Sequence, residues 1–284
     1  MKQIITMVGL LMLILVVGCI EECPPQQTCP TVTCPSLETL DNNLYVYFID
    51  VKHSDATLIK YKDTEMLIDC GSNIQGPDVV EFLKEKKVTN LEYLLITNLD
   101  EDNIGGCDDV LRHFHTNTVI TNGDNDDSSM YKEFKNEIDT EQLLVGSIGN
   151  SFNIGPSTLD IIQSNNGLSF QENSLVTKLI FNNISILFTG DCIEECEDLL
   201  LGKDINSTIL KPAHHGTKLA TDIDFLEKVN PDVAIISTGI DNNYGHPAYG
   251  TLDKLSQEGV IIYRTDYDGD VTVRMDGSSY EVLT

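Results

Sequence analysis

Leu94–Gly106 reads LLITNLDEDNIGG, and the rest of the chain can be interpreted around this stretch. It opens with a short apolar run, which is typical of a buried strand. A polar turn with Asp100, Glu101 and Asp102 follows, and the residues after Gly105-Gly106 have helical periodicity. Three carboxylates in one turn repel one another unless a cation lies among them. A solvated acidic loop would give the same letters, but the preceding strand and the two glycines favour a built site.

Strands and helices are predicted to alternate through residues 44–284, which suit one domain. Asn182-Asn183 has the composition of a hairpin turn, and the last residues are predicted to form another hairpin. Because the strands fall into two groups with helices around them, we predict an α/β fold, a four-layer αββα sandwich. The expected strands are 44–51, 55–61, 65–71, 94–96, 118–121, 157–163, 175–181, 184–190, 207–213, 232–238 and 260–265. The expected helices are about 76–87, the segment after Gly106, 130–139, 193–201, 224–230 and 251–257.

The N-terminus has the features of an export signal. Lys2 precedes an apolar run, Ile4–Val17, which is short for a membrane span and has the length of a signal-peptide core. The run ends Val-Val-Gly-Cys, which resembles a lipobox, so we expect residues 1–19 to be a lipoprotein signal with Cys19 as the acylated residue. An uncleaved anchor is the alternative. Both interpretations place the protein outside the cell, attached to the outer face of the cytoplasmic membrane.

Residues 20–43 are rich in proline, cysteine and threonine, and are predicted to be an extended stalk. Three cysteines lie there, at Cys23, Cys29 and Cys34. Disulfides fit them better than a zinc knuckle, because no CxxC pair or nearby histidine is present. The chain has eight cysteines. If Cys19 is lipidated, an odd number remains, so one is free or pairs between molecules.

The formal net charge is −27. Such a surface repels polyanions unless metal ions or a local basic patch intervene. The charge therefore argues against tight binding of duplex nucleic acid, although catalysis on a nucleic acid stays open.

The acidic turn resembles the HxHxDH signature of the metallo-β-lactamase superfamily. It is most similar to the HxDxDHIGG form in the hydrolase domain of ComEC-type DNA-uptake proteins. The match aligns Asn98 with the first histidine, Asp100 with the middle ligand, Asp102 with the ligand aspartate and Asn103 with the last histidine. Both motif histidines are therefore asparagine in this chain, and neutral amide oxygens are weaker ligands than imidazole.

Three further segments resemble the same family and carry residues expected to support the site from behind the ligands. FIDVKHSDAT at 48–57 retains Asp55, and its His53 is either a surface histidine or a replacement for a lost ligand. LIDCG provides Asp69, whose carboxylate is expected to hydrogen-bond the neighbouring motif loop. ENSLV provides Asn173, which either approaches the metal region or caps the start of a strand.

The second half of the chain continues the resemblance in motif order. LFTGD ends in Asp191, which the family uses to bridge two metals and which could also cap a helix. In LKPAHHGT, one of His214 and His215 is expected to be a ligand and the other a hydrogen-bonding neighbour. His246 of NYGHP is expected to contact substrate or act as a general acid. Arg264 would bind phosphate, or more simply pair with Asp266.

Two functions follow from these assignments. The first is a metal-dependent hydrolase, a phosphodiesterase or nuclease acting on single-stranded nucleic acid or a small phosphodiester, with Asp102, His215 and His246 as catalytic residues. The second is a catalytically degenerate lipoprotein that binds a ligand, ion or partner. An oxygen-rich set favours Mn²⁺ or Mg²⁺ over Zn²⁺, or no metal at all. No motif indicates a protein partner. The expected metal-binding residues are Asn98, Asp100, Asp102, Asn103, Asp191, His214 and His215.

Overall fold

The computed structural model describes residues 41–164 and 173–284, which belong to one compact unit. Cys19 and nearly all of the expected stalk lie outside the described residues, so their predicted roles stay predictions. In the part of the chain that is described, no helix has the length and apolar character needed to cross a membrane.

The first of two sheets contains both ends of the described chain. It has eight described strands in the order β15-β14-β1-β2-β3-β4-β5-β6. The pairs from β3 to β6 are parallel and the others are antiparallel. Its strands are β1 (Leu44–Phe48), β2 (Thr57–Tyr61), β3 (Thr64–Ile68), β4 (Asn90–Leu95), β5 (His115–Thr121), β6 (Leu143–Val145), β14 (Val271–Met275) and β15 (Tyr280–Leu283).

The second sheet, formed by seven described strands, has the order β13-β12-β11-β10-β9-β8-β7. The strands from β10 to β13 pair in parallel, as expected for strands joined through helices. Its strands are β7 (Ser151–Ile154), β8 (Ser157–Gln163), β9 (Val176–Phe181), β10 (Ile184–Phe188), β11 (Ile209–Lys211), β12 (Val233–Ile236) and β13 (Ile261–Arg264).

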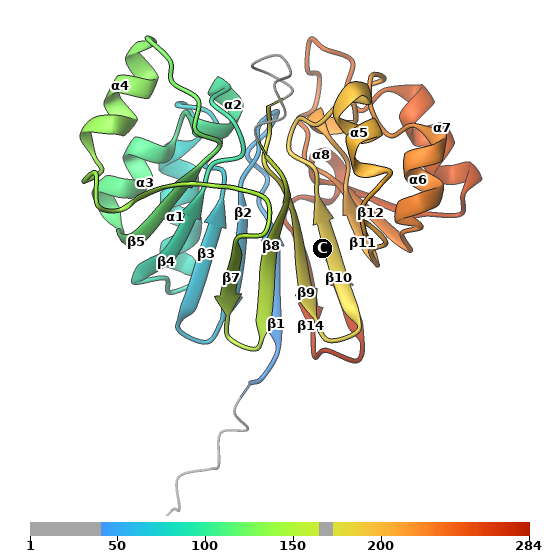
Figure 1. The fold of residues 1–284 in the computed structure, drawn as a ribbon, viewed down its shortest axis with the longest axis horizontal. Helices are drawn as coiled ribbons and strands as arrows, with labels where there is room; N and C mark the ends of the chain where they lie inside the picture. Colours follow the sequence, from blue (N-terminus) through green and yellow to red (C-terminus); the bar gives the residue numbers. More distant parts are fainter. Residues whose placement is uncertain (1–40, 165–172) are drawn as a thin grey trace, which may run out of the picture. The chain divides into compact units, whose positions relative to one another are not determined.

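The two sheets pack face to face, and helices cover the outer face of each (Figure 1). Buried residues from both sheets form the central core, where the rings of Phe48 and Phe188 lie 6.0 Å apart. The helices on the first sheet are α1 (Gly76–Glu85), α2 (Glu101–Ile104), α3 (Cys107–His113) and α4 (Ser129–Asn136). Those on the second are α5 (Glu194–Leu200), α6 (Ile223–Val229) and α7 (Tyr249–Gln257), with α8 (Thr265–Asp268) following β13. These four layers confirm the predicted αββα sandwich.

Several local features differ from the sequence predictions. The strands expected at 94–96 and 118–121 begin at Asn90 and His115. Helix α1 ends at Glu85 rather than near Lys87. The acidic turn is partly helical, because α2 begins at Glu101 and Gly105-Gly106 separates it from α3. The edge strands β6 and β7 and helix α8 were not predicted, since each has only three or four residues and so little periodicity.

Candidate metal centre

Three carboxylates meet where the two sheets bring their loops together. Asp100 and Asp102 follow β4, while Asp191 follows β10, and one oxygen of each lies within 4.8 Å of the others. Burial, and then the charges of the other two carboxylates, raise the pKa of Asp100 to about 6. Burial also raises the pKa of Asp191, whose Oδ1 has no hydrogen-bond partner. Ionisation of Asp100 and Asp191 is therefore disfavoured, and a cation among the three carboxylates would relieve that cost.

A set of close backbone contacts shapes the acidic turn. The carboxylate of Asp69 accepts hydrogen bonds from the Thr97 amide at 2.8 Å and the Thr97 hydroxyl at 2.9 Å, which fixes the end of β4. A Cβ on Gly105 would lie 2.4 Å from the Asn73 nitrogen, and one on Gly106 would lie 2.4 Å from the carbonyl oxygen of Cys70. The two glycines are thus needed for α2 and α3 to approach the loop after β3.

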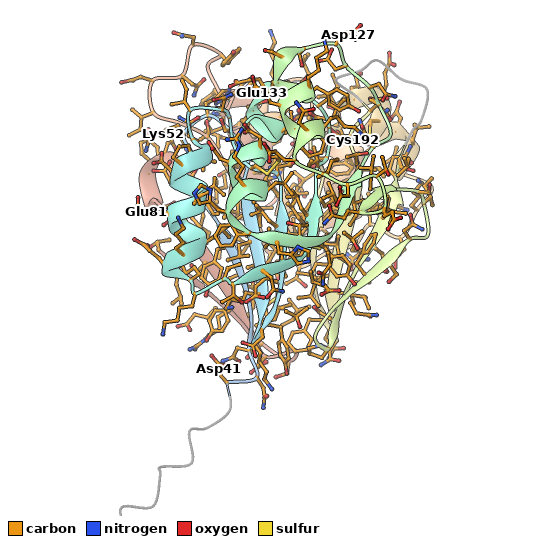
Figure 2. All side chains as sticks on the ribbon, turned by 90° about the vertical axis from the view of Figure 1, so that its left-hand side faces the viewer. Asp41, Lys52, Glu81, Asp127, Glu133 and Cys192 are labelled. Carbon is orange, nitrogen blue, oxygen red and sulfur yellow. A yellow bond between two sulfur atoms is a disulfide. The ribbon has the colours of Figure 1, made fainter. Side chains whose placement is uncertain are left out.

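Disulfides lie directly beside both carboxylate-bearing loops. Cys70, next to Asp69, is bonded to Cys107 at the start of α3. Cys192, next to Asp191, is bonded to Cys196 in α5. All four cysteines are fully buried, and the pairing is one that the sequence alone could not assign. Figure 2 places Cys192, together with Lys52 from the loop after β1, toward the end of the domain opposite Asp41.

The two asparagines that stand in place of motif histidines face Asp191 with their amide groups. Asn98 Nδ2 donates to Asp191 Oδ2 at 2.7 Å, and Asn103 Nδ2 donates to the same oxygen at 3.1 Å. Asn98 Oδ1 accepts from the Asp100 amide and from Asn103 Nδ2, so this oxygen is already used. Asn103 Oδ1 is buried and has no hydrogen-bond partner among the described residues. Of the two amide oxygens, only that of Asn103 is therefore open to a ligand role.

His215 is held at both ring nitrogens. Nδ1 lies 2.9 Å from the Ser237 carbonyl oxygen and Nε2 lies 3.0 Å from Asp102 Oδ2. Burial would lower the pKa of His215, but the charge of Asp55 and the hydrogen bond to Asp102 outweigh it and raise the pKa to about 9. Burial likewise opposes ionisation of Asp102, yet the bond to His215 lowers the pKa of Asp102. The pair is therefore imidazolium and carboxylate at neutral pH.

A buried ion pair stands behind His215. Lys211 Nζ lies 2.7 Å from Asp55 Oδ1, and both side chains are almost fully buried. Burial would raise the pKa of Asp55, but Lys211 and His215 outweigh it and lower that pKa. Lys211 was not among the predicted site residues. A lysine between an apolar strand and a proline resembles a surface residue, so only its place in the family-like LKPAHHGT segment could have identified it.

Four of the chain's six histidines form an imidazole cluster beside the carboxylates: His53, His214, His215 and His246. The His53 ring centroid lies 4.2 Å from that of His215 and 5.4 Å from that of His246. Burial, and then neighbouring histidines, lower the pKa values of His53 and His246 to about 4. His53 is thus a member of the site rather than an isolated surface residue, and His246 is neutral at pH 7.

Asn173 and Ser174 have separate contacts. Asn173 Nδ2 donates to both carboxylate oxygens of Asp124 at 2.9 Å, so it holds the 122–129 loop and makes no described hydrogen bond to the carboxylate trio. Ser174 Oγ accepts from the Asp191 amide at 2.9 Å and from Asn98 Nδ2 at 2.8 Å. Ser174 lies in the ENSLV segment but was not among the predicted site residues, because a serine just before a strand carries no distinguishing pattern.

Comparisons with known proteins agree with this geometry. Residues 49–160 match the family model of the metallo-beta-lactamase superfamily. The chain carries a metallo-β-lactamase-type domain. It is 26% identical over 208 residues to ComE operon protein 3 of Bacillus subtilis, covering 69% of this chain and 26% of that protein. It is 25% identical over 241 residues to Recombination protein 2 of Haemophilus influenzae, covering 82% and 29%. The chain thus spans less than a third of these relatives.

Solved structures share the fold of this metallo-β-lactamase-type domain. The metallo-beta-lactamase fold protein YhfI of Bacillus subtilis superposes with a TM-score of 0.55 at 12% identity, over 82% of this chain and 100% of that one. CmlA, a diiron beta-hydroxylase from Streptomyces venezuelae, gives 0.56 at 11% identity, over 82% of this chain and 54% of that chain. At these identities the likeness concerns the fold alone.

The residues present fit one divalent cation better than the two-metal site that the family resemblance implies. Asp100, Asp102 and Asp191 converge, and the partnerless Asp191 Oδ1 and Asn103 Oδ1 add free oxygen donors. The motif resemblance places imidazole ligands at 98 and 103, where this chain has amides instead. This donor set is rich in oxygen, which suits a hard cation.

Two peripheral features add little to the centre. Arg264 donates through Nε and Nη2 to Asp266 at 2.9 and 2.6 Å, which favours pairing with Asp266 over phosphate binding.

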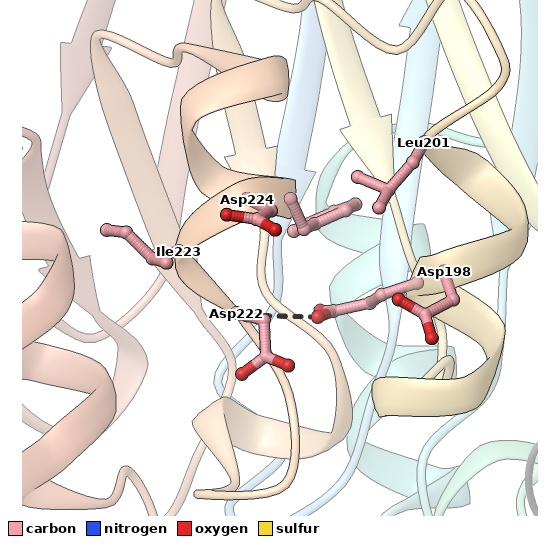
Figure 3. Close-up of a pocket in the computed structure, with 7 residues that line it drawn as sticks. Asp198, Leu201, Asp222, Ile223 and Asp224 are labelled. Carbon is pink, nitrogen blue, oxygen red and sulfur yellow. Dashed lines mark hydrogen bonds between the residues drawn. The ribbon is translucent and has the colours of Figure 1, made fainter.

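A separate acidic cavity of about 260 Å³ lies at α5 and α6 (Figure 3). Its buried Glu197 accepts hydrogen bonds from the Thr221 and Asp222 amides, so this carboxylate caps the start of α6.

Proposed function

We propose that the domain is a cation-dependent phosphodiesterase that acts on single-stranded nucleic acid or a small phosphodiester. The observation that supports it is the meeting of three carboxylates with an imidazole cluster at one end of the sandwich. Relatives named for competence and recombination favour a nucleic-acid substrate. The net charge of −27 disfavours a long duplex footprint, which leaves flexible substrates.

Asp100, Asp102 and Asp191 would hold the cation, with Asn103 Oδ1 as a further oxygen donor. A bound divalent cation would offset charge on the phosphoryl and leaving oxygens of the substrate. His246 is neutral at pH 7 because of its pKa of about 4, and its Nδ1 has no partner. This free nitrogen could accept a hydrogen bond from the attacking water or from the substrate, and the general-acid role expected from sequence stays a prediction. His215 keeps its proton and holds Asp102 in place.

We further propose Mn²⁺ or Mg²⁺ rather than Zn²⁺ as the cation. Carboxylate and amide oxygens are the ligands that these hard ions prefer, whereas imidazole and thiolate favour zinc. Elemental analysis of the full chain after mild dialysis tests the assignment. Tightly held, stoichiometric zinc would contradict it and would point to the imidazole cluster as the ligand set.

Turnover is tested on the full chain with Mn²⁺ against single-stranded DNA, RNA and a chromogenic phosphodiester. We expect cleavage that EDTA stops and that Asp191→Asn and His246→Ala abolish. Asp139→Asn is the matched control, because Asp139 is an exposed carboxylate without a described side-chain partner. Activity that survives Asp191→Asn would refute the proposed site.

A non-catalytic binding module is the second candidate, and one observation favours it. The amides of Asn98 and Asn103 both donate to Asp191 Oδ2, so neutral groups already satisfy one oxygen of the acid that would bridge two metals. If no cation supports turnover while titration calorimetry still shows Mn²⁺ binding that depends on Asp191, this second function replaces the first.

We also propose that Cys19 anchors the protein outside the cytoplasmic membrane, as its lipobox-like context indicates. The four cysteines of the described domain are all in disulfides, which supports an oxidising compartment. Replacing Cys19 with Ser and fractionating cells tests the anchor. Unchanged localisation and gel mobility would exclude lipidation.

A further inference from the structure

Tyr244 forms an exposed aromatic surface beside the carboxylates. Its side chain is 72% exposed, yet its ring stacks on His53 with centroids 4.8 Å apart and planes 16° apart. His53 in turn lies 4.2 Å from the ring of His215, whose Nε2 contacts Asp102. Tyr244 stacked on His53, and the tilted contact of His53 with His215, therefore form a series of ring contacts from solvent to Asp102, and the outermost ring is largely exposed.

Hydrogen bonds from the Asn242 side chain hold the loop that carries Tyr244. Asn242 Oδ1 accepts from the amides of Tyr244 at 3.2 Å and His246 at 3.0 Å, and Asn242 Nδ2 donates to the Gly239 carbonyl at 2.9 Å. A Cβ on Gly239 would lie 2.7 Å from the backbone nitrogen of His53, so only glycine lets the two loops approach. These contacts hold Tyr244 in register with His53 before any ligand binds.

Three of the cations near the centre are already paired with carboxylates. Arg264 is engaged by Asp266, and Lys52, next to His53, is paired with Asp50 at 3.0 Å. Buried Lys211 is bonded to Asp55. Stacking of bases on aromatic side chains supplies affinity without phosphate contacts and tolerates any base.

We infer that Tyr244, supported by His53, is a stacking surface for an unpaired nucleobase of the substrate. The inference rests on the proposed function for its link to cleavage, and it assigns the substrate class as single-stranded nucleic acid. It also predicts that affinity depends on the base more than on the number of phosphates.

The test measures binding by fluorescence anisotropy with the full chain in EDTA, where the proposed cation-dependent cleavage cannot consume the probes. The probes are a short oligothymidylate, an oligouridylate of the same length and an abasic oligonucleotide of the same length. We expect both base-bearing probes to bind more tightly than the abasic one. Tyr244→Leu should weaken their binding about fivefold or more, while Tyr244→Phe keeps it.

Tyr249→Leu is the matched control, because Tyr249 is 82% exposed and has no stacked ring among the described residues. The inference is overturned if Tyr244→Leu binds as the wild type does, if the abasic probe binds equally well, or if Tyr249→Leu loses as much affinity. Anisotropy needs no turnover. Base-dependent binding through Tyr244 without cleavage would therefore sustain the stacking surface and refute only the phosphodiesterase.

Discussion

The two halves of the centre differ in the side chains that they contribute to it. The half after β4 contributes Asp100 and Asp102 but has amides at 98 and 103. The half from the second sheet contributes Asp191 and three of the clustered imidazoles, His214, His215 and His246. The carboxylates still converge, because the amides donate to Asp191 and His215 bonds Asp102 across the sheets. The three acids therefore lie close together even though positions 98 and 103 carry amides and not imidazoles.

The largest expected effect comes from breaking the second half. Asp191→Asn removes the buried acid that both amides contact, while leaving a side chain of equal size. We expect Mn²⁺-dependent turnover to fall about a thousandfold or more, since a metal ion contributes several kcal/mol to such reactions. Titration calorimetry should show the matching loss of Mn²⁺ binding, and Asp139→Asn should retain both. Equal loss in the two variants would mean that net charge, not the site, is responsible.

The disulfides provide a stability comparison between the halves. Cys70 and Cys107 are separated by 37 residues, whereas Cys192 and Cys196 are separated by 4. In the chain-entropy model, the longer closure stabilises by about 4 kcal/mol and the shorter by about 2 kcal/mol. Replacing each pair by alanine should therefore lower the urea midpoint more for the first pair. The reverse order would show that packing around α5, and not loop closure, dominates.

Sequence and structure agree best where a motif follows a strand with a continuous apolar run. The apolar runs before Asn98 and Asp191 predicted β4 and β10. The family resemblance predicted that Asp100, Asp102 and Asp191 lie close together. Sequence could not orient the amides of Asn98 and Asn103, because their donors turn toward a partner that is distant in the chain.

Other members of the site escaped prediction for similar reasons. Ser174 and Lys211 act through single buried contacts that no periodicity reports. The disulfide pairing depends on which cysteines meet in space, and the place of His53 in the site depends on its ring contacts with His215 and Tyr244, which no sequence pattern reports.

Restoring the first half should change the metal preference. Asn98→His with Asn103→His replaces two amide donors by imidazole ligands and frees Asp191 Oδ2. We expect zinc affinity to rise on the order of tenfold or more, since imidazole suits Zn²⁺ better than amide oxygen. Competition with a chromogenic zinc chelator measures it, and Asn136→His at the exposed end of α4 is the control. An unchanged zinc affinity would show that the second half alone sets the metal preference.

The smallest expected effect is the pH dependence of cation binding in the first half. Asp100 has its pKa raised to about 6 by burial and by its acidic neighbours, so a proton competes with the cation there. Mn²⁺ affinity should therefore rise about fourfold from pH 5.5 to 7.5, as the carboxyl with a pKa near 6 ionises.

The stability of the cation-free protein gives an independent test of the raised pKa of Asp100. An acid whose pKa is higher in the folded state stabilises the fold at low pH, and that stabilisation is lost as the pH rises through its folded pKa. For Asp100 the free energy of unfolding should thus decline between about pH 4 and 6 in EDTA, and added Mn²⁺ should reverse the decline. Asp100→Asn should make the decline shallower, with the other buried acids still contributing, and should weaken Mn²⁺ binding at pH 7.5. If the wild-type affinity is already independent of pH in this range, Asp100 does not contact the cation, and Asp102 and Asp191 are left to hold it.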